Sequence, residues 1–264
     1  MEGKKVVLLV AAHKAVRFPE DDMYCPIQVG SALHPSFHTT YKDDTKDNIS
    51  SKNPTYCELT ALYWGWKNLD SSYMGLVHYR RFFATRNLFW PKWERIASQQ
   101  AIEKMLRQAP IILPKKRHYW IETNYSQYVH AHHSRDLLLT RAIIAQREPD
   151  YLQAFDRVMQ RTAGHRFNMF IMERSLLDSY CRWLFGILGE LEAQLDLSDY
   201  TPYDRRVFGF VGERLLDVWL EKNPAPFREI PVVFTERQNW LKKVSMFLLR
   251  KFRGGKTAGC IPIK

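Results

Sequence analysis

The sequence is poor in cysteine and lacks long apolar runs. Its four cysteines stand among 264 residues without Cys-x-x-Cys spacing, which argues against a disulfide framework or a cysteine zinc cage. No stretch approaches the roughly 20 apolar residues that a membrane-spanning helix needs. The apolar run at residues 6–12 is also too short for a convincing signal peptide. We therefore expect a cytoplasmic protein.

Common catalytic signatures are absent as well. The sequence contains no Gly-x-Gly-x-x-Gly after an apolar run, no Walker loop, no Gly-x-Ser-x-Gly and no His-Glu-x-x-His. These absences argue against hydride transfer, ordinary ATP hydrolysis and serine hydrolase chemistry.

Acidic residues are missing from the last 28 positions, and this explains most of the charge. Residues 237–264 contain eight lysines and arginines and no acid, so of the net charge of +11 only three positive charges belong to residues 1–236. On a helical wheel Trp240, Leu241, Val244, Phe247, Leu248 and Phe252 share one face, and cations share the other. This pattern predicts a tail lying on the anionic inner face of the cell membrane, which would make the protein peripheral. The alternative is a helix packed on the domain.

Buried strands and amphipathic helices alternate through residues 1–236. The apolar run in 4–14 and the short runs at 74–77, 110–114, 167–172 and 231–234 predict strands. Helical spacing of apolar residues predicts helices over 54–68, 96–108, 128–146, 151–160, 175–195 and 205–220. Residues 15–55 show little periodicity. This alternation indicates an α/β domain with helices on both faces of a mostly parallel sheet.

Cations follow the strand at 74–77. His78, Arg80 and Arg81 stand at its carboxyl end, where ligands bind in open sheets of this kind. Arginine forks suit the paired oxygens of a diphosphate, so a nucleotide diphosphate is the first ligand to consider. The alternative is that both arginines form surface ion pairs.

An ordered series of short motifs runs through the chain. Its first part consists of His13-Lys14, Tyr24-Cys-Pro-Ile-Gln-Val-Gly30, Asp43-Asp44-Thr45, Asn48-Ile-Ser50, Lys52-Asn53, Tyr56-Cys-Glu-Leu-Thr60, Tyr63-Trp64 and His78-Tyr-Arg-Arg-Phe82. Its second part consists of His132-His133, Asp136-Leu137, Phe167-Asn-Met-Phe-Ile-Met172, Arg206-Val-Phe-Gly-Phe210 and Glu213-Arg214-Leu215. The series covers residues 4–235. It resembles a bacterial family of capsular and exopolysaccharide synthesis proteins, long filed as a domain of unknown function, with galactofuranosyltransferases among its members.

The resemblance implies a glycosyltransferase of the GT-A type, with one Rossmann-like domain at residues 1–236 and the basic tail at 237–264 outside it. The implied reaction moves a hexose, with galactofuranose as the specific expectation, from a UDP-sugar. The implied acceptor is a lipid-linked polysaccharide in capsule, exopolysaccharide or O-antigen synthesis. This domain would bind no nucleic acid.

Residue roles follow from the chemistry that this resemblance implies. For the donor we expect contacts from cations and amides at the sheet edge, namely His13, Lys14, Asp44, Asn48, Asn53, His78, Arg80 and Arg81. Most such folds hold a divalent metal with an Asp-x-Asp motif, but this chain has His78-Tyr79-Arg80 where that motif is expected. Arginines can neutralise a leaving diphosphate without a metal. Mn²⁺ or Mg²⁺ recruited by Asp43 and Asp44 stays open as an alternative.

An inverting transfer also needs a carboxylate that takes the acceptor's hydroxyl proton. The candidate is Glu213, which lies away from the apolar stripe of its predicted helix; Asp204 and Asp136 are substitutes. For the acceptor we expect contacts from His132, His133, Asp136 and Asn168. His132 and Asp136 would lie one helical turn apart.

Two other classes of function remain open from the sequence. A noncatalytic protein of a polysaccharide assembly complex could use the tail for membrane docking. A nucleic-acid-binding protein would fit the isoelectric point of about 9.5. However, the near-balanced charge of residues 1–236 argues against it.

Overall fold

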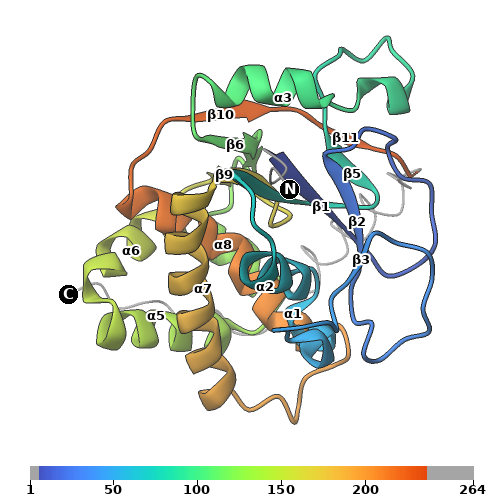
Figure 1. The fold of residues 1–264 in the computed structure, drawn as a ribbon. Coiled ribbons are helices and arrows are strands. Elements are labelled where there is room, and N and C mark those ends of the chain that lie inside the picture. The colour runs from blue at the N-terminus through green and yellow to red at the C-terminus, as the bar shows by residue number, and fades with distance from the viewer. Residues whose placement is uncertain (1–5, 237–264) are drawn as a thin grey trace.

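The computed structural model describes residues 6–236, so the predicted basic tail lies outside the described residues. One mixed sheet has the strand order β10-β6-β9-β4-β1-β2-β3, and β5 joins β4 to β11 beside this path (Figure 1). Its strands are β1 (Val6–Ala12), β2 (Tyr24–Gln28), β3 (Tyr41–Lys42), β4 (Tyr73–His78), β5 (Arg81–Phe83), β6 (Ile111–Pro114), β9 (Phe170–Glu173), β10 (Phe227–Ile230) and β11 (Val232–Phe234). A separate two-stranded sheet pairs β7 (Arg117–His118) with β8 (Ala163–Gly164).

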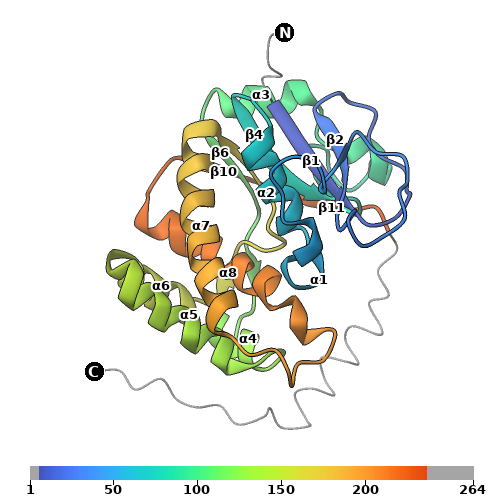
Figure 2. The same ribbon diagram turned by 60° about the horizontal axis from the view of Figure 1, so that its bottom comes forward.

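Helices cover both faces of the large sheet. The α-helices are α1 (Asn53–Tyr56), α2 (Leu59–Asn68), α3 (Gln99–Leu106), α4 (Asn124–Val129), α5 (Ser134–Arg147), α6 (Leu152–Gln160), α7 (Arg174–Gln194) and α8 (Val207–Lys222). Short 3₁₀ turns are η1 (Ser50–Lys52), η2 (Lys92–Arg95), η3 (Pro149–Tyr151) and η4 (Asp204–Arg206). Figure 2 shows α5, α6, α7 and α8 gathered on one side of the sheet. None of the helices within residues 6–236 is long and apolar enough to span a membrane.

The first strand shows why the sheet lies between two cores. All seven residues of β1 are buried. Because side chains alternate along a strand, Val7 and Leu9 pack in the core under α2, α7 and α8, while Leu8 and Val10 pack in the core under α3. The expected α/β class, with a mostly parallel sheet flanked by helices, is confirmed. One central strand is reversed, because β9 runs antiparallel to both β4 and β6.

A glycine allows β4 to lie close to β9. A Cβ placed on Gly75 would come within 2.3 Å of the Phe170 carbonyl oxygen, so a larger residue would push the strands apart. The β4 strand then turns at Tyr79 and Arg80, and β5 returns antiparallel to it. This turn places Arg80 at the carboxyl edge of the sheet.

Four expectations about local structure were wrong. The helix expected over 54–68 is two helices, α1 and α2, separated at Cys57. Residues 15–55 contain strand β2, which the sequence did not indicate because Pro26 lies inside it. The proline is tolerated because β3 pairs only with Ile27 and Gln28 and forms no ladder bonds with Pro26. The helix expected over 128–146 is two helices, α4 and α5, so His132 precedes α5 and does not share a helix face with Asp136. The strand expected from 167 begins at Phe170.

Candidate functional site

Two adjoining cavities open at the carboxyl ends of β1 and β4. The first, called the strand-end cavity here, has a volume of about 480 Å³, and its own walls include Ala11, His13, Val29, His34, Asn53, Pro54, Tyr79 and Pro202. The second, called the arginine pocket, has a volume of about 350 Å³. The two cavities share the wall residues Cys57, Glu58, His78, Arg80 and Arg206, so they form one continuous cleft.

The arginine pocket is strongly cationic. Six arginines line it, from segments scattered over the chain: Arg80, Arg81, Arg117, Arg166, Arg206 and Arg214. The acidic residues in its wall are Glu58 and Glu213. Such an excess of fixed positive charge in a concave wall favours an anionic ligand.

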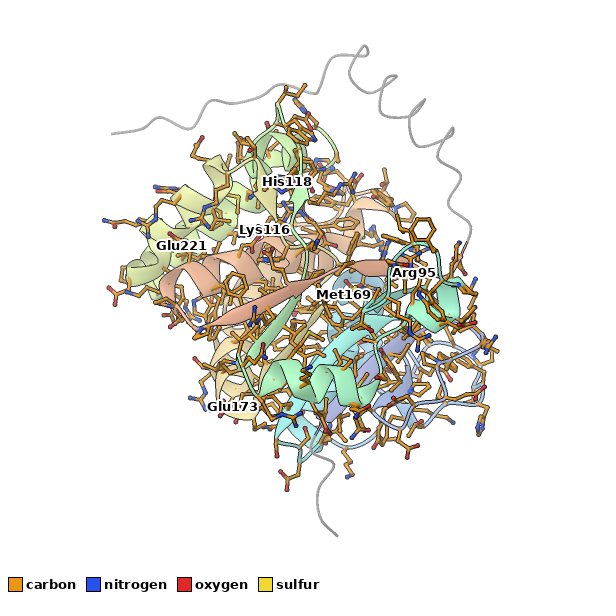
Figure 3. All side chains as sticks on the ribbon, turned by 90° about the horizontal axis from the view of Figure 1, so that it is seen from above. Arg95, Lys116, His118, Met169, Glu173 and Glu221 are labelled. Carbon is orange, nitrogen blue, oxygen red and sulfur yellow. The ribbon has the colours of Figure 1, made fainter. Side chains whose placement is uncertain are left out.

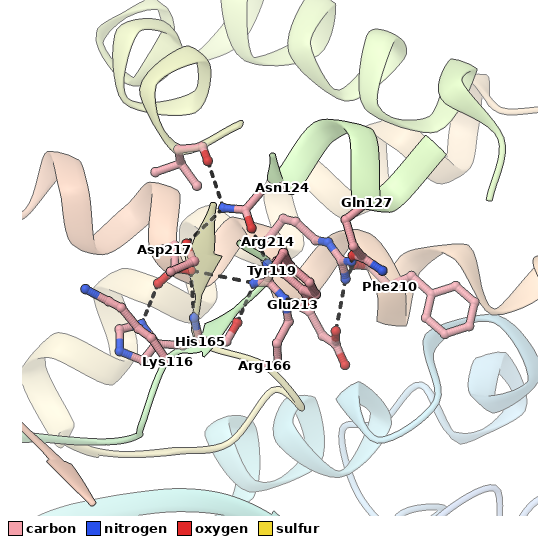
Figure 4. Close-up of polar contacts among 12 residues, drawn as sticks. Lys116, Tyr119, Asn124, Gln127, His165, Arg166, Phe210, Glu213, Arg214 and Asp217 are labelled. Carbon is pink, nitrogen blue, oxygen red and sulfur yellow. Dashed lines mark hydrogen bonds and ion pairs between the residues drawn. The ribbon is translucent and has the colours of Figure 1, made fainter. Parts of the chain in front are cut away.

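Arg166 is held in the wall by hydrogen bonds, and its side chain is only 3% exposed. Its Nε donates to the Tyr119 hydroxyl at 2.8 Å and its Nη1 to the His165 carbonyl at 2.6 Å. Its Nη2 donates to the Asn124 side chain (Figure 4). These contacts fix the guanidinium before any ligand arrives.

A buried acid supports Arg166 from behind. Asp217 Oδ2 accepts from the His165 backbone N–H at 2.9 Å and lies 3.7 Å from Arg166 Nη1, while Asp217 Oδ1 lies 2.5 Å from His165 Nδ1. Gly164 leaves room for this arrangement, since a Cβ there would come within 2.5 Å of Arg166 and 2.6 Å of Asp217. The group is built to position a cation at the cleft.

Arg214 is held in a similar way on α8. Its Nη1 donates to Glu213 Oε2 at 3.0 Å and its Nη2 to Gln127 Oε1 at 2.6 Å. Burial, together with the nearby charge of Arg166, lowers the pKa of Arg214. Within residues 6–236 its Nε and the Nε of Arg81 have no hydrogen-bond partner. Buried donors without partners are costly in a folded protein, so their presence here supports a ligand site.

The cleft contains the predicted base and a second carboxylate. Glu213 lies on α8 in the wall of the arginine pocket. Glu58, which the sequence analysis gave no role, stands at the start of α2 and lines both cavities. Its Oε1 accepts from Asn168 Nδ2 at 2.7 Å and lies 3.9 Å from His78 Nε2. The only sequence signal for Glu58 was its place in the Tyr56–Thr60 motif.

His78 behaves as a hydrogen-bonding group of this cleft. Its Nε2 lies 2.5 Å from the Phe167 carbonyl, which can only accept, so Nε2 carries the proton. Burial lowers the pKa of His78, against the opposing attraction of Glu58. The imidazole is therefore neutral at pH 7. It orients the cleft without adding a positive charge.

Backbone strain gathers around the same place. Of five non-glycine residues with positive φ within the described chain, three are Cys57 (53°), Phe167 (78°) and Asn168 (51°). Cys57 and Phe167 line the arginine pocket, and Asn168 bonds to Glu58. Strained backbone persists where surrounding contacts enforce it, and it clusters at functional sites.

The thiol of Cys57 serves as an anchor in this cleft. Arg206 Nε donates to Cys57 Sγ at 3.1 Å. Burial raises the pKa of Cys57 to about 12, so the thiol stays protonated and is a poor nucleophile. The contact holds Arg206 between the two cavities.

The expected donor residues are only partly gathered at the cleft. His13, Asn53, His78 and Arg80 line the strand-end cavity, and Arg81 lines the arginine pocket. Burial and the charges of Lys14 and Arg80 lower the pKa of His13. Lys14, Asp44 and Asn48 are not among the wall residues. Lys14 pairs instead with Glu236 at 3.1 Å, Asp44 is exposed, and Asn48 bonds the backbone of Lys46 and Ser50 within a turn.

The expected acceptor residues divide in the same way. His132 lines the arginine pocket and stacks on Phe210 at 4.2 Å. His133 packs on Tyr200, and both histidines lie 3.8 Å from the carboxylate of Asp204. Asp136 is buried among the hydroxyls of Tyr128 and Tyr200. Asn168 lies behind Glu58 and donates also to the Gly209 carbonyl at 3.1 Å.

Aromatic rings complete the wall of the arginine pocket. Tyr203 stacks near His132 and Phe210, with ring centroids 5.8 Å and 5.3 Å apart, and Tyr203 is half exposed. Sequence reasoning gave no role to Tyr203, Phe210, Arg117, Arg166 or Arg206, although Arg206 and Phe210 stand in the Arg206–Phe210 motif. Arg117 lies in β7, Arg166 in a loop and Arg206 in η4, so no periodicity marks these arginines.

The residues present do not fit a divalent metal. Asp43, the first of the two proposed ligands, is fully buried, and its oxygens accept from Gly30, Ser31, Ser50 and Thr60. Across the part of the chain that the structure describes, no group of three or more His, Cys, Asp or Glu side chains is placed to hold a metal ion.

Comparison with known proteins gives one family and one related structure. A search of curated proteins finds no match. The chain is similar to the apo structure of WbbM, described as a bifunctional glycosyltransferase, with 30% sequence identity and a TM-score of 0.82. The match covers 89% of this chain and 46% of the other, so this chain spans about half the length of that protein. The family described as domain of unknown function DUF4422 matches residues 7–224, and the chain therefore belongs to this family.

Proposed function

We propose that the protein is a glycosyltransferase that moves a hexose, with galactofuranose as the specific sugar, from a UDP donor to a lipid-linked polysaccharide acceptor. The observation that carries this proposal is the cleft itself: a strand-end cavity opens directly into a cationic pocket that contains a carboxylate. The similarity to a bifunctional glycosyltransferase supports the reaction class.

The donor is assigned to the strand-end cavity and the shared wall. A volume of about 480 Å³ suits a small ligand such as a nucleoside. The diphosphate would then lie at Arg80 and Arg206, which both cavities share, with Arg81 next to them. Charge that develops on the leaving diphosphate is stabilised there by arginines.

The acceptor is assigned to the aromatic side of the arginine pocket. The half-exposed ring of Tyr203, with His132 and Phe210 behind it, offers a face on which a sugar ring can stack. Glu213 takes the proton from the acceptor hydroxyl while that oxygen bonds to the anomeric carbon and the bond to the diphosphate breaks. Arg214 orients the Glu213 carboxylate through its 3.0 Å contact.

The test is a transfer assay on the full chain with UDP-galactofuranose, other UDP-hexoses and a lipid-linked acceptor. We expect UDP release that depends on acceptor, and weaker donor binding in Arg80→Ala. Arg228→Ala is the matched control, because Arg228 is exposed and bonds Gln108 away from the cleft. Donor binding without turnover would favour the noncatalytic assembly protein instead.

The metal alternative needs its own measurement. Thermal unfolding of the full chain is compared with UDP alone and with UDP plus Mn²⁺. A cationic clamp predicts stabilisation by UDP that is independent of metal. Stabilisation by UDP that strictly requires Mn²⁺ would contradict the clamp and favour a metal site that includes Asp44.

Membrane association through residues 237–264 is part of this proposal, as is a cytoplasmic location. The support is the amphipathic pattern and the eight cations of that segment. Sedimentation with anionic vesicles, comparing the full chain with one stopped before Arg237, tests it. Equal binding of the two chains would contradict the role of the tail.

A further inference from the structure

Three consecutive large apolar side chains stand exposed on the loop between β5 and η2. Leu88 is 79% exposed, Phe89 95% and Trp90 46%. Single exposed apolar residues are ordinary on a soluble protein, but a run of three presented together indicates an interaction site. We call residues 88–90 the apolar tip.

The loop is held so that the tip points outward. The Asn87 side chain accepts from the Phe89 backbone N–H at 3.2 Å, and the Trp90 N–H donates to the Asn87 carbonyl at 3.4 Å. Arg86 lies over the Trp90 ring at 4.4 Å and pairs with Glu94 at 3.8 Å. These local contacts give the tip a defined turn, which an unstructured loop would lack.

The surroundings of the tip are cationic. Arg86, Lys92 and Arg95 flank it, against the single acid Glu94. Aromatic side chains beside arginine and lysine are the composition that binds at the headgroup level of an anionic bilayer. A protein partner with an apolar groove would not need these flanking cations.

The tip also lies near the point where the described chain ends. The η2 turn packs against β11, and the Ala84 N–H donates to the Pro231 carbonyl at 2.8 Å. Figure 3 shows Arg95 close to the strand that leads to residue 236. Residue 236, where the described chain ends, therefore follows a strand at the same edge of the domain as the tip.

We propose that the apolar tip inserts Leu88, Phe89 and Trp90 into the headgroup region of an anionic membrane, as a second contact beside the basic tail. The tip supplies apolar burial and the tail supplies charge attraction. Two weak contacts on one edge bind together far more tightly than either alone. This inference extends the proposed membrane association and does not depend on the identity of the sugar.

The experiment measures sedimentation with phosphatidylglycerol vesicles and with phosphatidylcholine vesicles. Four chains are compared: the full chain, the tip variant Leu88→Ser/Phe89→Ser/Trp90→Ser, the chain stopped before Arg237, and both changes together. We expect the tip variant to lose roughly tenfold in affinity for the anionic vesicles, with or without the tail. The tip side chains are exposed, so its melting temperature should not change.

A matched control separates the tip from exposed apolar surface in general. Trp120 and Ile121 are 85% and 74% exposed and follow Lys115, Lys116 and Arg117, so this pair matches the tip in exposed apolar side chains and nearby cations. It differs in position, because the neighbouring His118 lies apart from Arg95 in Figure 3. Trp120→Ser/Ile121→Ser should keep the vesicle binding of the full chain. An equal loss in this control would overturn the assignment to the tip.

The measurements also distinguish a membrane from other partners of the tip. If the full chain and the tip variant bind anionic vesicles equally, the proposal is wrong, whatever the tail contributes. If sedimentation velocity shows a dimer of the full chain that the tip variant lacks, a second copy covers the tip and the membrane is not its partner. Loss of binding on tail removal alone, with no effect of the tip, would leave the tail hypothesis standing and overturn this one.

Discussion

Residues 43–50 follow β3 and residues 78–81 lie at the end of β4 in the same sheet, and both segments are rich in polar side chains. In the first segment the polar side chains bond to the surrounding fold. Asp43 accepts from two backbone N–H groups and two hydroxyls, and Asn48 caps a turn. In the second segment Arg80 and Arg81 face cavities, and among residues 6–236 the Nε of Arg81 is unpartnered. Polar density alone does not mark a site. Hydrogen-bond donors that have no partner and lie beside a cavity do mark a site.

The largest effect is expected at Glu213, which lines the same pocket as residues 78–81. Glu213→Gln keeps the shape of the side chain but removes the proton acceptor, so the transfer rate should fall about 10²- to 10⁴-fold. Because Glu213 is also the charged partner of the buried Arg214 at 3.0 Å, the free energy of unfolding should fall by about 1–3 kcal/mol, so the transfer rate is compared per folded molecule. Initial rates at saturating donor and acceptor, with urea unfolding of the same samples, give both quantities.

Glu58→Gln is the control for this assignment, because Glu58 lies in the same cleft. Its Oε1 contacts Asn168 and lies near His78, which suits a positioning role with a loss of about tenfold. If Glu58→Gln abolished transfer while Glu213→Gln kept most of it, the two roles would have to be exchanged.

The next effect concerns stability in residues 43–50. Asp43→Ala leaves buried donors on Gly30, Ser31, Ser50 and Thr60 without their acceptor. The free energy of unfolding should fall by about 3 kcal/mol, while UDP binding per folded molecule stays the same. Asp44→Ala, at an exposed neighbour, should stay within about 0.5 kcal/mol of wild type. An Asp43 variant with normal stability and no UDP binding would contradict the structural role of Asp43 and place it in the ligand site.

The sheet was predictable because its central strands are continuous apolar runs. The strands β1 and β4 are buried on both faces, so nearly every residue in them is apolar and the run itself is the signal. The α7 and α8 helices carried clear 3.6-residue periodicity. Prediction failed where the pattern was interrupted: Pro26 lies inside β2, and the four residues between Val129 and Ser134 separate two helices that the apolar spacing predicted as one.

The site was only partly predictable, for a different reason. His78, Arg80 and Arg81 follow a recognisable strand, so sheet topology alone brings them to the ligand edge. Arg117, Arg166 and Arg206 come from short strands, loops and a 3₁₀ turn that meet only in the folded chain. Glu58 was missed because the backbone turn at Cys57 directs it to the cleft, and a positive φ at cysteine has no sequence signature.

A smaller effect is expected from Arg166→Lys. Lysine keeps the charge but cannot donate to Tyr119, Asn124 and the His165 carbonyl together. The free energy of unfolding should fall by about 2 kcal/mol, and affinity for the anionic ligand should weaken several-fold. Arg161→Lys is the matched control at an exposed pair with Glu221, where a change of no more than about 0.5 kcal/mol is expected. If both substitutions had equal effects, the hydrogen bonds of Arg166 would not have the structural and binding role that we assign to them.

The smallest expected effect is the pH dependence that His78 brings to stability. Burial lowers its pKa in the folded chain below the ordinary value of 6.5. The unfolded chain therefore takes up a proton first as the pH falls, and stability is lost below about pH 6.5 until the folded state is protonated as well. One proton limits the slope to about 1.4 kcal/mol per pH unit. Above this window the stabilisation is fully present.

Comparison with His78→Gln isolates this contribution. Glutamine can still donate to the Phe167 carbonyl but does not titrate, so the variant should lose less stability than wild type between pH 6.5 and pH 5. His13, whose pKa is also lowered, contributes equally to both chains and cancels in the difference. Urea unfolding at several pH values measures that difference. If the two chains lost stability in parallel, the pKa of His78 would not be lowered in the folded chain, and below about pH 6.5 the ligand edge of the sheet would carry one more cation than we infer.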